Sequence, residues 1–119
     1  LAFGADAGEA AWLAAPWLQG RRVAYWGDLD TWGLHMLATA RHHLPHLQAL
    51  LMDAATFSAH QHLAVAEPVH APDSACGTLA PDEATLCVHL RTQQKGRLEQ
   101  EFVPTNAVHR AVRAWVDGD

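Results

Sequence analysis

Short apolar runs and helical apolar stripes alternate along this chain. Runs typical of buried strands cover residues 1–3, 22–26 and 47–52. Apolar residues at helical spacing predict helices at residues 6–15, 33–43, 56–65, 81–93 and 104–116. Strands that alternate with helices in this way favour an α/β fold, in which right-handed crossovers build a mainly parallel sheet flanked by helices.

Two further segments differ from this alternation. Residues 97–103 place Leu98, Gln100 and Phe102 on one face and Glu99 and Glu101 on the other, which predicts a strand with one solvent-exposed face. Residues 68–80 contain two prolines and one glycine and show no periodicity, so we expect a loop there.

Length and composition indicate an ordinary soluble domain. The chain has 119 residues, enough for one core, and 50% of them are hydrophobic. No apolar run approaches the roughly 20 residues of a membrane span, so we expect no membrane partner. The formal net charge is −5 at pH 7 and Lys95 is the only lysine. Strong DNA binding by this domain alone is therefore not expected, because phosphate contacts need Lys and Arg.

The cysteines and the first residue bear on where the chain belongs. Cys76 and Cys87 are not in a Cys-x-x-Cys pattern, and we expect free thiols in a cytoplasmic protein. The sequence begins at Leu1 without a methionine, which we interpret as a cut within a larger protein.

The turn after the second apolar run carries the clearest candidate chemistry. Asp28 and Asp30 follow this run, and Asp53 follows the next one. In a parallel sheet, residues at the carboxyl ends of strands share one edge, where ligands bind. Carboxylate oxygens suit Mg²⁺ or Mn²⁺, so we predict a metal site there. Each residue also has a structural interpretation: Asp30, Thr31 or Asp53 could cap a helix, and Asp28 could be a turn residue.

Three segments together resemble a known family. Residues 25–33 read Tyr-Trp-Gly-Asp-Leu-Asp-Thr-Trp-Gly, residues 50–53 read Leu-Leu-Met-Asp, and residues 97–101 read Arg-Leu-Glu-Gln-Glu. The combination resembles the carboxyl-terminal domain of the Wadjet plasmid-defence subunit JetD, which is similar to the Toprim domain of type IIB topoisomerase A subunits and Spo-eleven. The resemblance covers nearly the whole chain. It implies a single Toprim-like, Rossmann-like domain over residues 1–119, cut from the carboxyl-terminal part of a larger protein.

The resemblance also implies an activity. Asp28 and Asp30 would be the Toprim metal pair, with the accompanying glutamate upstream of Leu1, and Glu99 and Glu101 are further candidate catalytic residues. The full-length protein would be a Mg²⁺-dependent, topoisomerase-like DNA endonuclease of an anti-plasmid complex, whereas the isolated fragment would be inactive. Its implied partners are double-stranded DNA, SMC-like complex subunits and a second copy of itself.

Other functions fit parts of the pattern. Asp28 and Asp30 also match the nucleophile motif of haloacid-dehalogenase-like phosphatases, in which Asp28 would be phosphorylated, with Lys95 as the candidate lysine. A non-catalytic scaffold is a third interpretation. We expect Tyr25 to be a packing residue. His35 lies in the first turn after the aspartates and could contact a phosphate or a metal-bound water. Zinc could be suggested by a group of five histidines, His42, His43, His46, His60 and His62. Nothing pairs them with the cysteines at zinc-finger spacing, which favours scattered surface residues.

Overall fold

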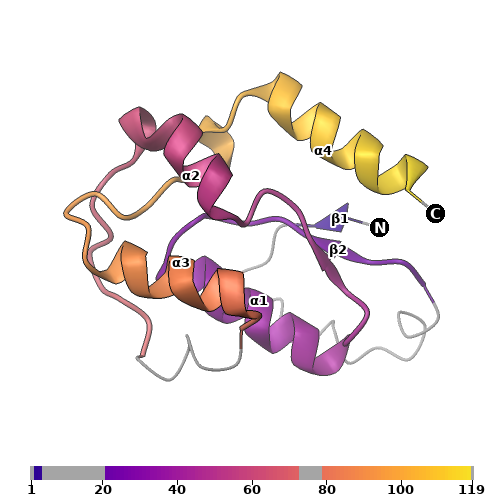
Figure 1. Cartoon of the computed structure of the whole chain (residues 1–119), viewed down its shortest axis with the longest axis horizontal. Coiled ribbons are helices and arrows are strands. Elements are labelled where there is room, and N and C mark those ends of the chain that lie inside the picture. The colour runs from indigo at the N-terminus through magenta and orange to yellow at the C-terminus, as the bar shows by residue number, and fades with distance from the viewer. Residues whose placement is uncertain (1, 4–20, 73–78, 119) are drawn as a thin grey trace.

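A small parallel sheet lies at the centre of the molecule. The structure is a computed structural model and describes residues 2–3, 21–72 and 79–118 (Figure 1). Strands β1 (Ala2–Phe3), β2 (Ala24–Tyr25) and β3 (Gln48–Ala49) pair in parallel in the order β1-β2-β3. The predicted α/β class with a parallel sheet is confirmed, and the helix predicted at residues 6–15 lies outside the described residues.

The other predicted helices are present with shifted boundaries. The helices are α1 (Thr31–His43), α2 (Ala54–His60), α3 (Pro81–Arg91) and α4 (Thr105–Asp117), with 3₁₀ turns η3 (Gln61–Leu63) and η5 (Gln100–Phe102). Helix α1 starts two residues before the predicted 33–43 segment because Asp30 caps it. The predicted helix at residues 56–65 is split between α2 and η3.

The strand predicted at residues 97–103 is wrong. Only Arg97 and Leu98 make isolated antiparallel bridges, to Val65 and Leu29 respectively. The chain then turns into η5, which leaves Phe102 49% exposed rather than on a buried face. The alternation predicted a strand because it records side-chain polarity, whereas a strand also needs a neighbour that pairs along its whole length.

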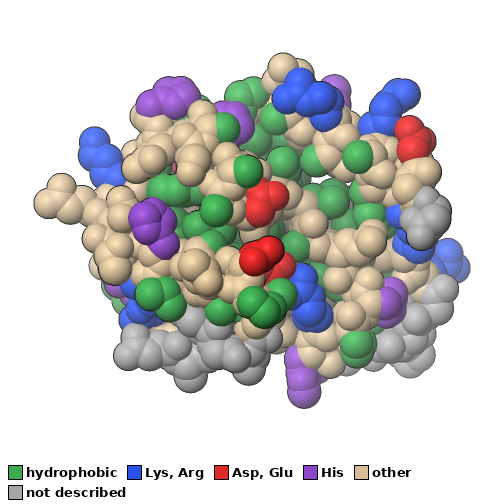
Figure 2. Space-filling view, viewed as in Figure 1, with side chains coloured by type: hydrophobic (Ala, Val, Ile, Leu, Met, Phe, Trp, Pro, Cys, Tyr) green, Lys and Arg blue, Asp and Glu red, His purple; other side chains and the backbone are tan. Residues whose placement is uncertain are grey.

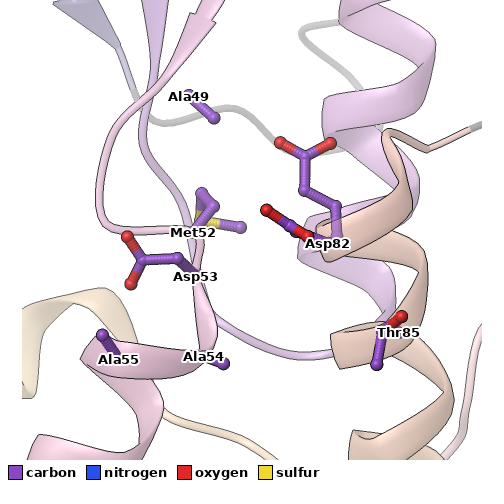
Figure 3. A pocket seen from close by; sticks show the side chains of 8 residues that line it. Ala49, Met52, Asp53, Ala54, Ala55, Asp82 and Thr85 are labelled. Carbon is purple, nitrogen blue, oxygen red and sulfur yellow. The ribbon is translucent and has the colours of Figure 1, made fainter.

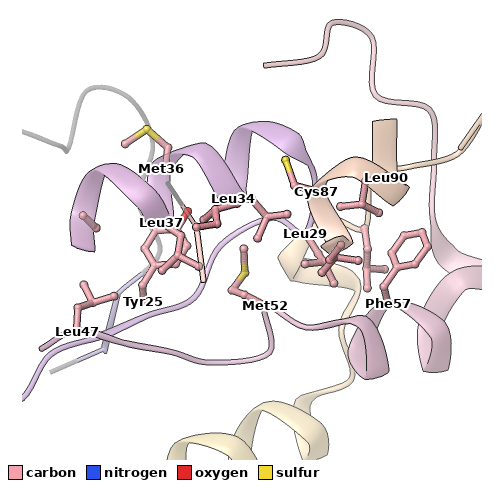
Figure 4. Close-up of a cluster of buried hydrophobic side chains, with 14 of the residues drawn as sticks. Tyr25, Leu29, Leu34, Met36, Leu37, Leu47, Met52, Phe57, Cys87 and Leu90 are labelled. Carbon is pink, nitrogen blue, oxygen red and sulfur yellow. The ribbon is translucent and has the colours of Figure 1, made fainter. Parts of the chain in front are cut away.

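The core lies between the sheet and helices α1 and α3. Figure 4 shows side chains from β2, α1, α2 and α3 meeting in one cluster. Its fully buried members include Tyr25, Leu34, Leu37 and Leu90. Figure 1 shows α4 on one side of the strands and α1 and α3 on the other. No described residue of α4 is fully buried, although Val108 packs against the core.

The structure bears on the state of the cysteines and on membrane-spanning helices. Cys87 is buried and disulfide-bonded, so the expectation of free thiols is wrong for this residue. Sequence spacing missed this because pairing depends on where the fold brings each cysteine; Cys76 lies outside the described residues. Among the described residues, no helix has the length and apolar character needed to cross a membrane.

Candidate functional site

The turn between β2 and α1 is shaped by close backbone contacts. A Cβ atom at Gly33 would lie 1.8 Å from the carbonyl oxygen of Asp28, so only glycine allows this approach. The buried hydroxyl of Tyr25 donates a hydrogen bond to the carbonyl oxygen of Gly33 at 2.9 Å. Tyr25 is thus a packing residue, as predicted. These contacts fix the backbone that carries Asp28 and Asp30.

Asp30 caps α1 and keeps one oxygen for another partner. Its Oδ1 accepts a hydrogen bond from the backbone N–H of Gly33 at 2.6 Å, and its extended backbone is typical of a cap. Its Oδ2 lies 3.4 Å from Nε of Arg97. The capping interpretation is therefore confirmed for Asp30, and the cap occupies only one of the two carboxylate oxygens.

Asp28 is held in the same manner. Its Oδ1 accepts a hydrogen bond from the backbone N–H of Gln100 at 2.9 Å, across 72 positions of sequence. Its Oδ2 lies 3.5 Å from Nη2 of Arg97. In both aspartates, then, a backbone N–H orients one oxygen while the second faces the same guanidinium.

Arg97 is the residue on which the carboxylates converge, and sequence reasoning missed it. Its Nη2 also lies 3.3 Å from Oε1 of Glu99, so three carboxylates surround one guanidinium. Two bridges place it there: Arg97 pairs with Val65, and the adjacent Leu98 pairs with Leu29. The one available signal was the spacing of Arg97 and Glu99, since residues two apart share a face in extended chain.

Burial makes the charge on Asp30 costly. Asp30 is 4% exposed, and this burial is the main reason that its pKa rises from 3.8 to about 6. Nearby Glu67 and Asp28 raise the pKa further, whereas the Gly33 N–H and Arg97 lower it. A bound cation would favour the ionised form of this carboxyl group.

Glu67 is a second residue that the sequence did not single out. Its side chain is 2% exposed and lies beside the start of α1. Its carboxylate accepts a hydrogen bond from Oγ1 of Thr31 at 2.8 Å and one from the N–H of Trp32 at 3.3 Å. The same Thr31 hydroxyl accepts a hydrogen bond from the N–H of Ala71 at 2.8 Å. Thr31 therefore links segments rather than capping α1.

Asp53 is not one of the carboxylates that contact Arg97. It caps α2, where its Oδ1 accepts a hydrogen bond from the N–H of Thr56 at 2.8 Å. Asp53 and Asp82 line an open pocket of about 560 Å³. Figure 3 shows them on opposite sides of it. Glu101 is exposed on η5 and is not one of the carboxylates around Arg97. The roles predicted for Asp53 and Glu101 remain predictions.

The carboxylates of Asp28, Asp30 and Glu99, which surround Arg97, suit a hard cation. Oxygens of Asp28 and Glu99 both lie within 3.5 Å of one nitrogen of Arg97, and carboxylate oxygens are the ligands that Mg²⁺ prefers. Within residues 2–3, 21–72 and 79–118, no three His, Cys, Asp or Glu side chains are arranged as a ready metal site. A cation there would need these side chains to rearrange around it and would keep water ligands.

On the face that Figure 2 shows, acidic side chains lie near the middle and again near one edge, while Lys and Arg side chains are scattered. His35 is half-buried and packs edge-on against Trp32, with ring centroids 5.7 Å apart. A contact of His35 with a phosphate or a metal-bound water stays a hypothesis from the sequence.

Comparison with known families gives one match over most of the chain. The family model described as "Wadjet protein JetD, C-terminal" matches residues 2–112. A comparison with curated proteins found no match. The matched range includes Asp28, Asp30, Arg97 and Glu99.

Proposed function

The chain belongs to the family of Wadjet JetD carboxyl-terminal domains, and from this premise we propose that it supplies the metal-binding carboxylates of a DNA-cleaving module. Membership of the family implies involvement in Wadjet defence. The proposal adds a reaction, the Mg²⁺-dependent cleavage of phosphodiester bonds, and a Toprim-like version of the α/β fold.

One observation carries the proposal. Asp28 and Asp30 follow β2, and each has one oxygen fixed by a backbone N–H and a second oxygen facing a common cation. Such an arrangement orients carboxylate oxygens before any ligand arrives, which lowers the cost of binding a cation. Neither helix capping nor turn formation requires the two second oxygens to converge.

The proposed chemistry divides between the metal and the chain. When bound, Mg²⁺ would neutralise phosphate charge and acidify a coordinated water. Asp28 and Asp30 would hold it, and Glu99 would add a third carboxylate from a distant part of the sequence. Burial around Asp30 would strengthen its attraction to the cation, because charges interact more strongly where water is excluded.

Other parts of the machinery would come from outside this domain. A net charge of −5 is poorly suited to holding DNA, so we propose that further domains or a second subunit supply the basic surface. Double-stranded DNA, SMC-like subunits and a homodimer are the partners that the family suggests. The isolated domain should bind DNA weakly and should not cleave it.

Isosteric substitutions in the full-length protein test the proposal. Asn keeps the shape of Asp and still caps a helix, but it lacks the charge that holds a cation. We expect Asp28→Asn and Asp30→Asn to abolish plasmid cleavage with little loss of thermal stability. Asp82→Asn, at an exposed acid of α3, is the control for a lost negative charge. Cleavage near the wild-type rate in both site variants would refute the proposal.

Two additional measurements separate the alternatives. The first is cleavage by Asp53→Asn. Loss of cleavage in this variant would include Asp53 among the metal-binding carboxylates. An aspartyl-phosphate trapped at Asp28 during turnover of a phosphate monoester would favour the phosphatase interpretation instead. The phosphatase interpretation needs Lys95 as its lysine, but the cation beside Asp28 is Arg97, and Lys95 is exposed.

A further inference from the structure

Arg97 lies where the proposed metal ion would bind. Its guanidinium lies within 3.5 Å of oxygens from Asp28, Asp30 and Glu99, so it supplies the positive charge that these carboxylates need. If the proposed function is right, one position has two candidate cations. They cannot share it, because each needs the same Oδ2 atoms of Asp28 and Asp30.

The contacts of Arg97 are those of a displaceable partner. Its three nitrogen–oxygen distances are 3.3 to 3.5 Å, longer than the roughly 2.7 to 2.9 Å of a strong charge-assisted hydrogen bond. Its Nε is buried and has no hydrogen-bond partner among the described residues. By contrast, Arg41 binds both oxygens of Glu83 at 2.5 and 3.1 Å. Arg97 is therefore held by charge and lacks the directional bonds that lock Arg41.

Charge balance gives Arg97 a second task once a metal is present. Three ionised carboxylates and one Mg²⁺ leave a net charge of minus one, which repels a phosphodiester. With Arg97 alongside, the group is neutral and can accept the phosphate. Its guanidinium can also donate two parallel hydrogen bonds to two phosphate oxygens. A metal ion held by carboxylates cannot donate such bonds.

The backbone allows this change of partner. Backbone hydrogen bonds with Val65 at 2.8 and 2.9 Å hold Arg97 in place, so only its side chain needs to move. That side chain is 31% exposed, whereas the side chain of Asp30 is 6% exposed. The Arg97 side chain is thus partly open to solvent, although its Nε is buried.

We propose that Arg97 occupies the cation position of the metal-free site and, when Mg²⁺ displaces it, contacts the phosphate to be cleaved. This inference rests on the proposed function and adds a residue to it. Arg97 would compete with the metal before substrate binds and would assist substrate binding afterwards. The two effects have opposite signs, which makes them separable by experiment.

Metal affinity tests the competition. Mn²⁺ binding to the full-length protein without DNA is measured by electron paramagnetic resonance for wild type, Arg97→Gln, Arg97→Lys and Arg41→Gln. We expect Arg97→Gln to bind Mn²⁺ about tenfold more tightly than wild type, since it removes the competing charge. Arg97→Lys and the control Arg41→Gln should stay within about twofold of wild type. Equal Mn²⁺ affinity in wild type and Arg97→Gln would overturn the competition.

Cleavage tests the phosphate contact. At saturating Mg²⁺, Arg97→Gln should cut plasmid at least about a hundredfold more slowly than wild type, despite its tighter metal binding. Cleavage at the wild-type rate would overturn the phosphate contact. Mn²⁺ binding to Asp28→Asn tests the proposed function separately. If this variant binds Mn²⁺ as tightly as wild type, the proposed function is wrong, and the inference about Arg97 is wrong with it.

Discussion

The buried carboxyl group of Asp30 should make the domain less stable as the pH rises. Its pKa is about 6 in the folded state, against 3.8 for an ordinary Asp. Below pH 3.8 the group is protonated in both the folded and the unfolded state. Between 3.8 and about 6 the unfolded state ionises first, so folding loses free energy until both forms are ionised. At about 1.36 kcal/mol per pH unit, the loss is about 3 kcal/mol by pH 8.

Asp30→Asn removes this dependence while keeping a capping side chain. Urea unfolding between pH 4 and pH 8 should show the free energy of unfolding falling by about 2.4 kcal/mol less in the variant than in wild type, because part of the loss already occurs below pH 4. Asp53→Asn, which also retains a helix cap, is the matched control for a lost carboxylate at an exposed position. Parallel wild-type and Asp30→Asn profiles over this range would refute the argument that burial penalises the charge on Asp30.

Three further substitutions test the packing around the site. Thr31→Val should lower the free energy of unfolding by about 2 to 3 kcal/mol in urea titrations, because it removes one hydrogen bond from Glu67 and leaves the Ala71 N–H without its partner, whereas Thr31→Ser should cost less than about 1 kcal/mol. Gly33→Ala should cost about 3 kcal/mol or more in thermal unfolding, since its Cβ meets the Asp28 carbonyl; a loss below 1 kcal/mol would contradict this. A double-mutant cycle on Arg41 and Glu83 should give a coupling of about 1 kcal/mol, and a value near zero would mean that solvent screens the pair.

Local patterns in the sequence determined the helices and the position of the aspartate pair. Apolar spacing located α1, α3 and α4, because a helix is built from contacts between residues three and four positions apart. The apolar run before Asp28 and Asp30 placed them at the carboxyl end of β2, since a buried strand ends where polar turn residues begin. The candidate pair could therefore be found without a structure.

The partners of that pair were decided only by the tertiary structure. Arg97 and Glu99 reach the turn because Arg97 and Leu98 bridge to residues far away in the sequence, and the strand predicted at residues 97–103 is limited to these two bridges. Asp53 follows a strand as Asp28 does, yet it caps α2 and is not one of the carboxylates that contact Arg97. Hydrophobic periodicity records which face of a segment is buried, but it carries no information about which distant segment the fold places against it. The identity of the charge beside Asp28 depends on that placement, which arises only when the whole core packs.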